Sequence, residues 1–433
     1  MGQPVPASIR AAVREAAARI PSRSVPQGVS ALAALEESRE VDGVLFLLNT
    51  VGGDVEAGLA IAEAVASMEK PTASLVLGGG HSIGVPLAVA VPNAKAWEPG
   101  SPFLYGVRYE VLDAAGKAVD TVSSYAGMRK IHIEGNKVFL NNRPLKFRLV
   151  LDQGFYPDGI WTAPSDAALK RDIELSMAAG FNGARLHQRV FERRFLYHAD
   201  RMGYLVWGEY GNWGLNHADP TALKYYLLPW AESVGRDYNS PALVGWCPFN
   251  ETWDIDGHRQ DDALLYNVYK MTKELDPYRP VIDTSGNYHV ATDVYDVHDY
   301  EQDTAEFAAH YEPMKTGGPV HDAHTKRQSY GGQPYFVSEY GGIYWNPEER
   351  EKGWGYGKAP RSLKEFEDRF IGLTRTLLDN PRICALCYTQ LYDIEQEKNG
   401  LYFYDRTPKF SEDMIARMHD AMAGEAAIEK AGA

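Results

Sequence analysis

The chain has 433 residues, of which 45% are hydrophobic and 24% charged, a composition typical of a globular protein with one large domain and smaller modules. Its formal net charge of −14 and the lack of a Lys/Arg run exclude nucleic acid as an expected partner, because phosphates carry the same sign. The absence of a membrane-length apolar run, the N-terminus without a signal-type core and the three cysteines favour a cytoplasmic protein without membrane contact or a disulfide framework.

Residues 1–90 have the pattern of a βαβ unit. The apolar runs "GVLFLLNT" and "TASLVLGG" flank the helix-like "EAGLAIAEAVASM", which predicts two strands joined by a helix. The segment "GGGHSIG" follows and places Ser82 after glycines at a predicted helix start. A serine there is exposed and close to backbone donors, as a nucleophile requires.

Residues 91–143 change to short alternating strands. Turn signals at "AAGK", "EGN" and "LNNRP" separate about four of them. A complete β-sandwich needs roughly seven strands, so we expect a truncated sandwich here.

From residue 144 to 433 the pattern is strand, loop and helix, repeated. Ser165 and Gly180 flank the first predicted helix as its N-cap and its end. This α/β pattern predicts a (β/α)₈ barrel, and the alternative is a doubly wound sheet, which lacks its Gly-rich phosphate loop here. The eight predicted strands are "KFRLVLDQ", "FNGARLH", "YLVWGEY", "ALVGWCPFN", "PVIDTSG", "VYDVHDY", "PYFVSEY" and "ICALCYTQL".

Polar residues gather at the predicted strand ends, where barrel enzymes carry their catalytic groups. Among them, Glu251 and Glu339 each end an apolar strand. Glycoside hydrolysis uses such a pair, and a carboxyl separation of about 5 Å indicates retention whereas a wider one indicates inversion. The alternative is two structural ion pairs. The strand-end residues are Asp152, Arg185, His187, Glu209, Asn250, Glu251, His298, Asp299, Glu339, Tyr388, Gln390 and Asp393.

Aromatic residues near these strand ends suit stacking on a sugar ring, and packing inside the barrel is the equal alternative. They are Trp207, Trp213, Trp246, Trp253, Tyr340, Trp345 and Tyr388.

The segments "WCPFNETWD", "FVSEYGG" and "CYTQLYDIEQEKNGLYFYDRTPK" resemble glycoside hydrolase family 2, the β-galactosidase and β-glucuronidase group, and the resemblance runs from about residue 92 to the end. It implies a retaining mechanism on β-linked sugars, with Glu251 as general acid/base and Glu339 as nucleophile. It demands no cofactor, although some family members hold structural metal ions, and no metal-binding residue is predicted in this chain. The substrate-binding residues expected are Asn250 at the sugar 2-hydroxyl, Arg185, His187, His298, Tyr300, Trp345 and Tyr388.

Two departures from the family bear on the substrate and on the domains. Glucuronidases carry an Asn-x-Lys pair where this chain has Glu397 and Asn399, so a sugar carboxylate would be repelled and a neutral, galactosidase-like substrate is expected. The sequence shows no counterpart of the family's N-terminal jelly-roll domain or of much of its Ig-like domain. Whether the chain forms a homo-oligomer is left open by the sequence.

Residues 26–90 resemble the ClpP-like translocation-enhancing peptidases. The resemblance implies Ser82 as nucleophile and the amides of Gly52 and Gly53 in the oxyanion hole. The His expected some twenty-five residues later is missing from "LYGVRYE", so we predict a vestigial peptidase site. The predicted segments are therefore 1–90, 91–143 and 144–433. A serine peptidase and a silent carbohydrate-binding protein are the alternatives to a glycosidase.

Overall fold

A computed structural model describes residues 44–48, 72–76, 94–113, 115–347 and 352–430. The chain divides into two compact units. One comprises residues 1–96 and 104–128, and the other comprises residues 97–103 and 129–433.

The larger unit contains all eight strands predicted for the barrel, the fourth divided in two. In chain order they are β10 (Phe147–Asp152), β11 (Gly183–Leu186), β12 (Leu205–Glu209), β13 (Leu243–Cys247), β14 (Phe249–Asn250), β15 (Thr284–Ser285), β16 (Tyr295–Asp299), β17 (Tyr335–Gly341) and β18 (Ile383–Thr389). Nearly every residue in them is buried, as expected for parallel strands covered on both faces.

The strand order is that of a closed barrel. Seven parallel strands form a sheet in the order β13-β12-β11-β10-β18-β17-β16, so β10 lies between the second strand and the last. β14 pairs in parallel with β15, and the Ser285 hydroxyl of β15 donates to Asp296 of β16 at 2.6 Å. The (β/α)₈ prediction is therefore confirmed over the doubly wound alternative.

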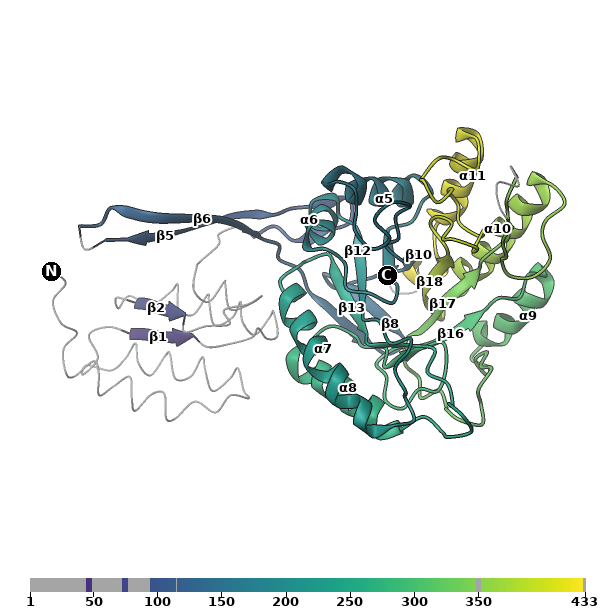
Figure 1. Cartoon of the computed structure of the whole chain (residues 1–433), viewed down its shortest axis with the longest axis horizontal. Helices are drawn as coiled ribbons and strands as arrows, with labels where there is room; N and C mark the ends of the chain where they lie inside the picture. Colours follow the sequence, from purple (N-terminus) through teal and green to yellow (C-terminus); the bar gives the residue numbers. More distant parts are fainter. Residues whose placement is uncertain (1–43, 49–71, 77–93, 114, 348–351, 431–433) are drawn as a thin grey trace. The chain divides into compact units, whose positions relative to one another are not determined.

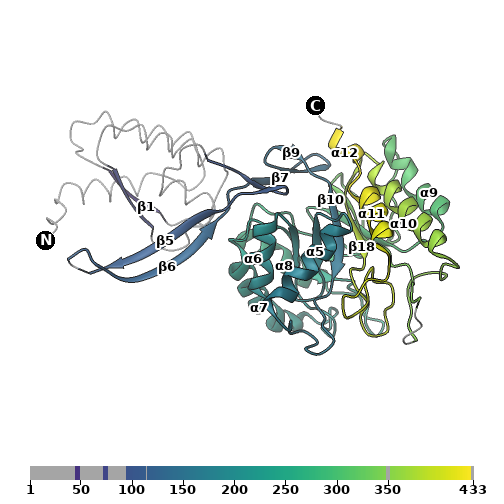
Figure 2. The same cartoon turned by 90° about the horizontal axis from the view of Figure 1, so that it is seen from above.

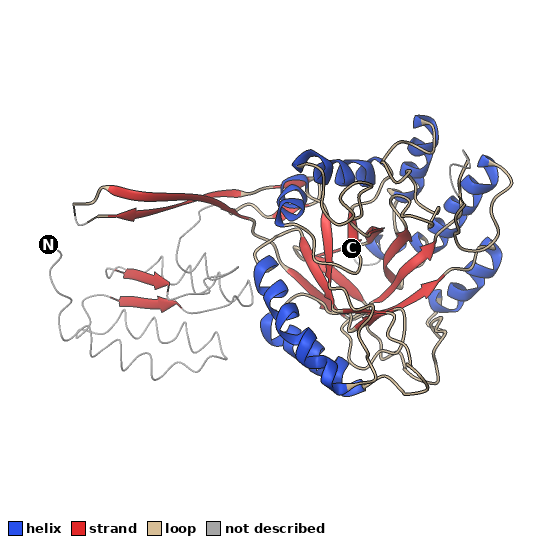
Figure 3. Cartoon of the chain, in the orientation of Figure 1, coloured by secondary structure: helices blue, strands red, loops and turns tan. Residues whose placement is uncertain are grey.

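Helices surround the strands (Figures 1 and 3). Neighbouring pairs around the ring are α5 with α6, α7 with α8, α9 with α10, α10 with α11, and α11 with α5, and Figure 2 shows α10 beside α11. None of the helices in the described ranges has the length and apolar character needed to cross a membrane. The helices are α5 (Asp166–Ala178), α6 (Arg193–Met202), η1 (Pro220–Ala222), α7 (Leu223–Asp237), α8 (Asp262–Leu275), α9 (Thr304–Lys315), α10 (Leu363–Leu378), α11 (Glu412–Met422) and α12 (Ala427–Lys430).

The first barrel helix begins and ends where the sequence predicts. The Ser165 hydroxyl accepts the Ala168 N–H at 3.2 Å, which satisfies one of the free donors of the first turn. Gly180 follows the helix with φ +90°, a left-handed conformation that favours glycine.

Aromatic packing fills the barrel interior beneath the strand ends. The Trp207 ring lies edge-on to Phe147 with centroids 5.6 Å apart and 5.8 Å from Phe336. A methyl group on Gly245 would lie 2.6 Å from the Trp207 ring, so only glycine leaves room for the indole. This apolar layer supports Glu209, two residues further along the same strand.

The segment predicted as a truncated sandwich forms three small antiparallel sheets. They pair β3 (Trp97–Glu98) with β4 (Ser101–Pro102), β5 (Tyr105–Leu112) with β6 (Ala118–Ala126), and β7 (Ile131–Glu134) with β8 (Lys137–Leu140) and β9 (Arg143–Pro144). Seven of the nine β6 residues are exposed. The boundaries at residues 90 and 143 stay predictions.

Two parallel strands are described in the N-terminal ninety residues. β1 (Val44–Leu48) pairs with β2 (Thr72–Val76) in parallel, which agrees with the predicted βαβ unit. Ser82, Gly52 and Gly53 lie outside the described residues, so the vestigial peptidase site stays a prediction.

Candidate active site

Arg185 of β11 is the centre of a polar cluster at the carboxyl ends of the strands. Its side chain is fully buried. It donates from Nε to Glu209 and from Nη1 to the Ser338 carbonyl at 3.0 Å and to Glu339 Oε1 at 3.1 Å. Although burial alone would lower the pKa of Arg185, the charges of Glu209 and Glu339 raise it. The guanidinium is therefore a fixed positive charge in the site.

Glu209 is the main counter-charge of Arg185. Burial alone would raise the pKa of Glu209, but Arg185 and His187 lower it to about 2, so the carboxylate is ionised at neutral pH. His187 Nδ1 lies 3.3 Å from Glu209 Oε2 and 3.2 Å from Arg185 Nη2. The sequence placed Glu209 at a strand end without indicating this role.

Asn250 is held by its backbone and leaves a side-chain donor free. Asn212 accepts from the Asn250 N–H and donates to the Asn250 carbonyl, both at 2.9 Å. The Asn250 Oδ1 accepts from Arg185. Its Nδ2 is buried and has no partner within the described part of the chain, so it is available to a ligand in the site.

The two predicted carboxylates meet at His298. The imidazole Nδ1 lies 2.8 Å from Glu251 Oε1, and Nε2 lies 3.3 Å from Glu339 Oε1. One oxygen from each carboxylate and one ring nitrogen all lie within 4.8 Å of one another. The strand ends therefore bring Glu251 and Glu339 face to face.

Charge is shared unevenly in this trio. Burial alone would lower the pKa of His298, but Glu339 and Glu251 raise it. Burial alone would raise the pKa of Glu251, but the hydrogen bond and the charge of His298 lower it. In the free site, the proton between these two groups therefore resides on the imidazole.

Glu339 is more tightly held than Glu251. Tyr300 donates its hydroxyl to Glu339 Oε2, and its ring stacks on Tyr356 with centroids 3.4 Å apart. Both oxygens of Glu339 thus have partners, and its side chain is 6% exposed against 28% for Glu251. Glu339 is therefore fixed in the barrel, whereas Glu251 is accessible to solvent.

The predicted aromatic residues include buried ones that pack inside the barrel and exposed ones. Trp207, Trp246, Tyr340 and Tyr388 are at most 2% exposed and pack in the barrel. Trp213 and Trp253 are 63% and 49% exposed, so both rings are accessible from solvent. The Trp213 ring lies edge-on to His187, 5.8 Å away.

Two further residues predicted to bind substrate pack their rings against α10. The fully buried Tyr388 ring packs 5.0 Å from Phe370 of α10, and its contact with substrate stays a prediction. Trp345 packs its ring against Phe366 of the same helix, 6.0 Å away.

Glu397, at the position that distinguishes the chain from glucuronidases, is part of an amide network. Gln153 and Gln390 each donate to Glu397 Oε2 at 3.0 Å, and Gln390 also donates to Asn399 at 2.8 Å. Burial raises the pKa of Glu397, and these hydrogen bonds oppose the rise. Since Glu339 and His187 both act on its titration, Glu397 lies within electrostatic reach of the site.

The fold and the cluster define a (β/α)₈-barrel protein with a carboxylate pair at the carboxyl ends of its strands. Residues 131–421 match the family "Glycosyl hydrolases family 2, TIM barrel domain", and the chain belongs to this family. Residues 17–102 match the Clp protease family.

Curated relatives match the two parts of the chain separately. A β-galactosidase of Vibrio cholerae is 29% identical over 216 residues, which are 48% of this chain and 20% of that protein. The translocation-enhancing protein TepA of Halalkalibacterium halodurans is 58% identical over 77 residues, which are 18% of this chain and 30% of that protein. The chain thus spans less than a third of either relative.

Solved structures share the fold. A family 2 β-galacturonidase from Eisenbergiella tayi bound to galacturonate has a TM-score of 0.62 and 21% identity, over 78% of this chain and 62% of that chain. A β-glucuronidase of Bacteroides uniformis has a TM-score of 0.63 and 20% identity, over 76% of this chain and 41% of that chain.

Proposed function

We propose that the barrel hydrolyses a terminal β-linked sugar by double displacement, with Glu339 as nucleophile and Glu251 as general acid/base. One observation carries the proposal: oxygens of the two carboxylates lie within 4.8 Å of each other. Retaining glycosidases hold their carboxyl groups about 5 Å apart, whereas inverting enzymes need about 6.5–9.5 Å to admit a water.

The roles follow from how each carboxylate is held. A nucleophile must meet the anomeric carbon at one fixed place, and the contacts of Glu339 with Arg185 and Tyr300 favour it for that role. The acid/base must exchange protons with the leaving group and with water, and Glu251 is the more exposed carboxylate.

The reaction comprises two displacements at the anomeric carbon. A Glu339 oxygen bonds to the anomeric carbon while the bond to the leaving oxygen breaks, and that oxygen takes a proton from Glu251. A water then attacks the same carbon, gives its proton to Glu251 and releases Glu339. In the free site the proton that Glu251 gives to the leaving oxygen resides on His298. When substrate separates the two groups, the imidazole gives the proton to Glu251, whose pKa is no longer lowered by the cation.

Asn250 is suited to bind the sugar 2-hydroxyl. Its free Nδ2 can donate to a hydroxyl of the bound ring, while Arg185 and Asn212 keep the side chain and backbone in place. Hydrogen bonds to the 2-hydroxyl that strengthen in the transition state add to the rate.

The first test is a panel of nitrophenyl β-glycosides offered to the folded full chain. We expect turnover of at least one neutral sugar, because all the groups that the proposed mechanism uses lie together in the barrel. Sugar binding without turnover would favour the carbohydrate-binding alternative. Labelling by a fluorophosphonate probe that is lost in Ser82→Ala would favour a serine peptidase.

Glu397 is proposed to select against uronides. Glu397→Gln keeps an acceptor for Gln153 and Gln390 but removes the charge, so kcat/KM for an aryl β-glucuronide should rise about tenfold (~1.4 kcal/mol) relative to the neutral β-galactoside. In the unsubstituted chain the same ratio should rise as the pH falls toward the raised pKa of Glu397. The control is Glu395→Gln, an exposed carboxylate in the same loop. Wild-type preference for the uronide, unchanged in Glu397→Gln, would contradict the assignment.

A further inference from the structure

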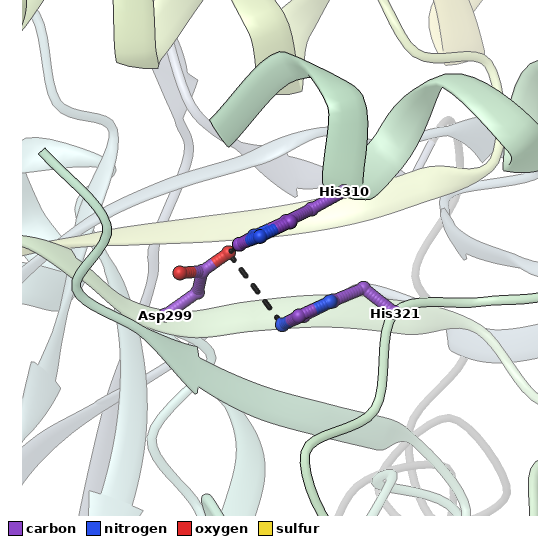
Figure 4. A group of neighbouring side chains, drawn as sticks. All are labelled: Asp299, His310 and His321. Carbon is purple, nitrogen blue, oxygen red and sulfur yellow. Dashed lines mark hydrogen bonds and ion pairs between the residues drawn. The ribbon is translucent and has the colours of Figure 1, made fainter. Parts of the chain in front are cut away.

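A second cluster lies beside the site at the same strand end. Asp299 ends β16 between His298 and Tyr300, which contact the two carboxylates. Because successive side chains of a strand point to opposite faces, Asp299 faces away from them. Figure 4 shows it meeting His310 of α9 and His321 of the following segment.

The three side chains place their donor atoms close together. Asp299 Oδ2 lies 2.8 Å from His310 Nδ1 and 3.7 Å from His321 Nε2. One donor atom from each residue lies within 4.8 Å of the others. Zinc–ligand bonds of about 2.0–2.2 Å in a tetrahedron put neighbouring donors about 3.3–3.6 Å apart, between the two distances observed.

The carboxylate is oriented before any ion arrives. Its Oδ1 accepts the Glu301 N–H at 3.1 Å, and its Oδ2 accepts the Tyr311 hydroxyl at 2.9 Å. Such outer contacts orient metal-binding carboxylates. Asp299 is buried, but the His310 and His321 side chains are 32% and 23% exposed, so an ion can reach them from solvent.

The two imidazoles lie face to face. Their rings stack with centroids 4.1 Å apart and an interplanar angle of 5°, where two imidazolium charges would repel each other. Neutral imidazole is the form that binds metal.

We propose that Asp299, His310 and His321 bind one divalent transition-metal ion of the zinc class, with solvent completing its coordination. Two imidazoles and one carboxylate are a donor set that zinc accepts. The ion would link β16, α9 and the segment after α9, and so hold the strand end that carries His298. The binding itself does not depend on the glycosidase proposal.

The active-site group of Glu251, His298 and Glu339 also has its donor atoms within 4.8 Å of one another. It is the poorer metal site for two reasons. Arg185 lies 3.1 Å from Glu339 and is a fixed positive charge that repels a dication. His298 is already engaged by both carboxylates.

The test is titration of chelator-treated full chain with Co²⁺, whose visible absorption reports tetrahedral coordination, followed by displacement with Zn²⁺. A Glu251→Gln/Glu339→Gln background removes the active-site trio from the measurement. We expect one equivalent bound with Kd at or below about 1 μM, and a loss of at least about 100-fold in His310→Ala and in His321→Ala, since each removes a ligand. His258→Ala, an exposed histidine, should bind as the background does.

Circular dichroism of each variant controls for folding, and His321→Gln provides a conservative second variant with the same expected loss. Zn²⁺ should also raise the Tm of the background protein and not that of His310→Ala. Binding weaker than about 100 μM, or equal binding by all the variants, would overturn the proposal. Asp299, His310 and His321 would then be a hydrogen-bonded cluster without a metal.

Discussion

Glu339→Ala is expected to lower kcat on an aryl β-glycoside by about 10⁵-fold or more, since removal of a covalent nucleophile costs on the order of 10⁶ in well-studied enzymes. Azide should restore part of the turnover by attacking the sugar from the side that Glu339 occupied. The product would then be the α-glycosyl azide. This stereochemistry, read by NMR, reports the place of the nucleophile independently of how much activity is lost.

Glu251→Ala should give the opposite azide product. The glycosyl intermediate on Glu339 still forms, and azide attack upon it yields the β-glycosyl azide with net retention. The loss should be about 10²–10⁴-fold and smallest for a good leaving group such as dinitrophenolate, which needs no proton. Asp256→Asn, an exposed carboxylate in the same loop, is the matched control. An α-configured sugar released by the unsubstituted chain would mean inversion and would sink the double-displacement proposal.

The barrel strands and the two carboxylates could be predicted because their signals are local. A strand covered on both faces is a short apolar run, and its carboxyl end is where the polar residues begin. Glu251 and Glu339 stand at such ends, and the structure brings them together. The boundaries of the N-terminal segments stay predictions.

The direction of individual side chains could not be predicted. The pairing of β17 with β18 shifts register between Val337 and Tyr340, and such irregularities break the alternation that assigns residues to a face. Tyr388 was predicted to contact substrate from its place at a strand end, and its ring packs against Phe370 of α10. The sequence of one strand does not show where its pairing with the adjacent strand shifts register, so it does not fix which face each side chain points to.

Contacts between distant positions are equally hidden. Arg185 is 154 positions from Glu339, and neither neighbourhood shows a motif for the pair. The cluster of Asp299, His310 and His321 joins a strand, a helix and a loop, with no spacing that a motif could capture. These contacts depend on barrel closure, which places the strand ends around one mouth.

Arg185→Met is expected to lower the free energy of unfolding by about 3–5 kcal/mol, because it leaves a buried carboxylate without its counter-charge. The carboxylate is Glu209, whose side chain is 1% exposed. Urea unfolding at pH 7 measures the loss. Arg259→Met, which removes an arginine 60% exposed, should change the stability by less than about 1 kcal/mol.

The pH dependence identifies Glu209 as the cause. In the unsubstituted chain its pKa is lowered to about 2, so its contribution to stability is present above the unfolded value of about 4.3 and is lost as the pH falls toward 2. Without Arg185, burial is less opposed and the pKa of Glu209 rises. The folded variant then binds its proton more tightly than the unfolded chain does, so the deficit of Arg185→Met should shrink as the pH falls below neutrality.

A double variant separates charge balance from positioning. Arg185→Met/Glu209→Gln removes both charges and keeps acceptors for the Gln188 N–H and His187 that now contact Glu209, so we expect it to regain most of the lost stability. Turnover should not return, because Glu339 and Asn250 still lack the guanidinium that holds them. If turnover returns with stability, Arg185 serves only to neutralise Glu209. If stability returns alone, the arginine positions the reacting groups, and the ion pair with Glu209 is what keeps a full positive charge buried beside them.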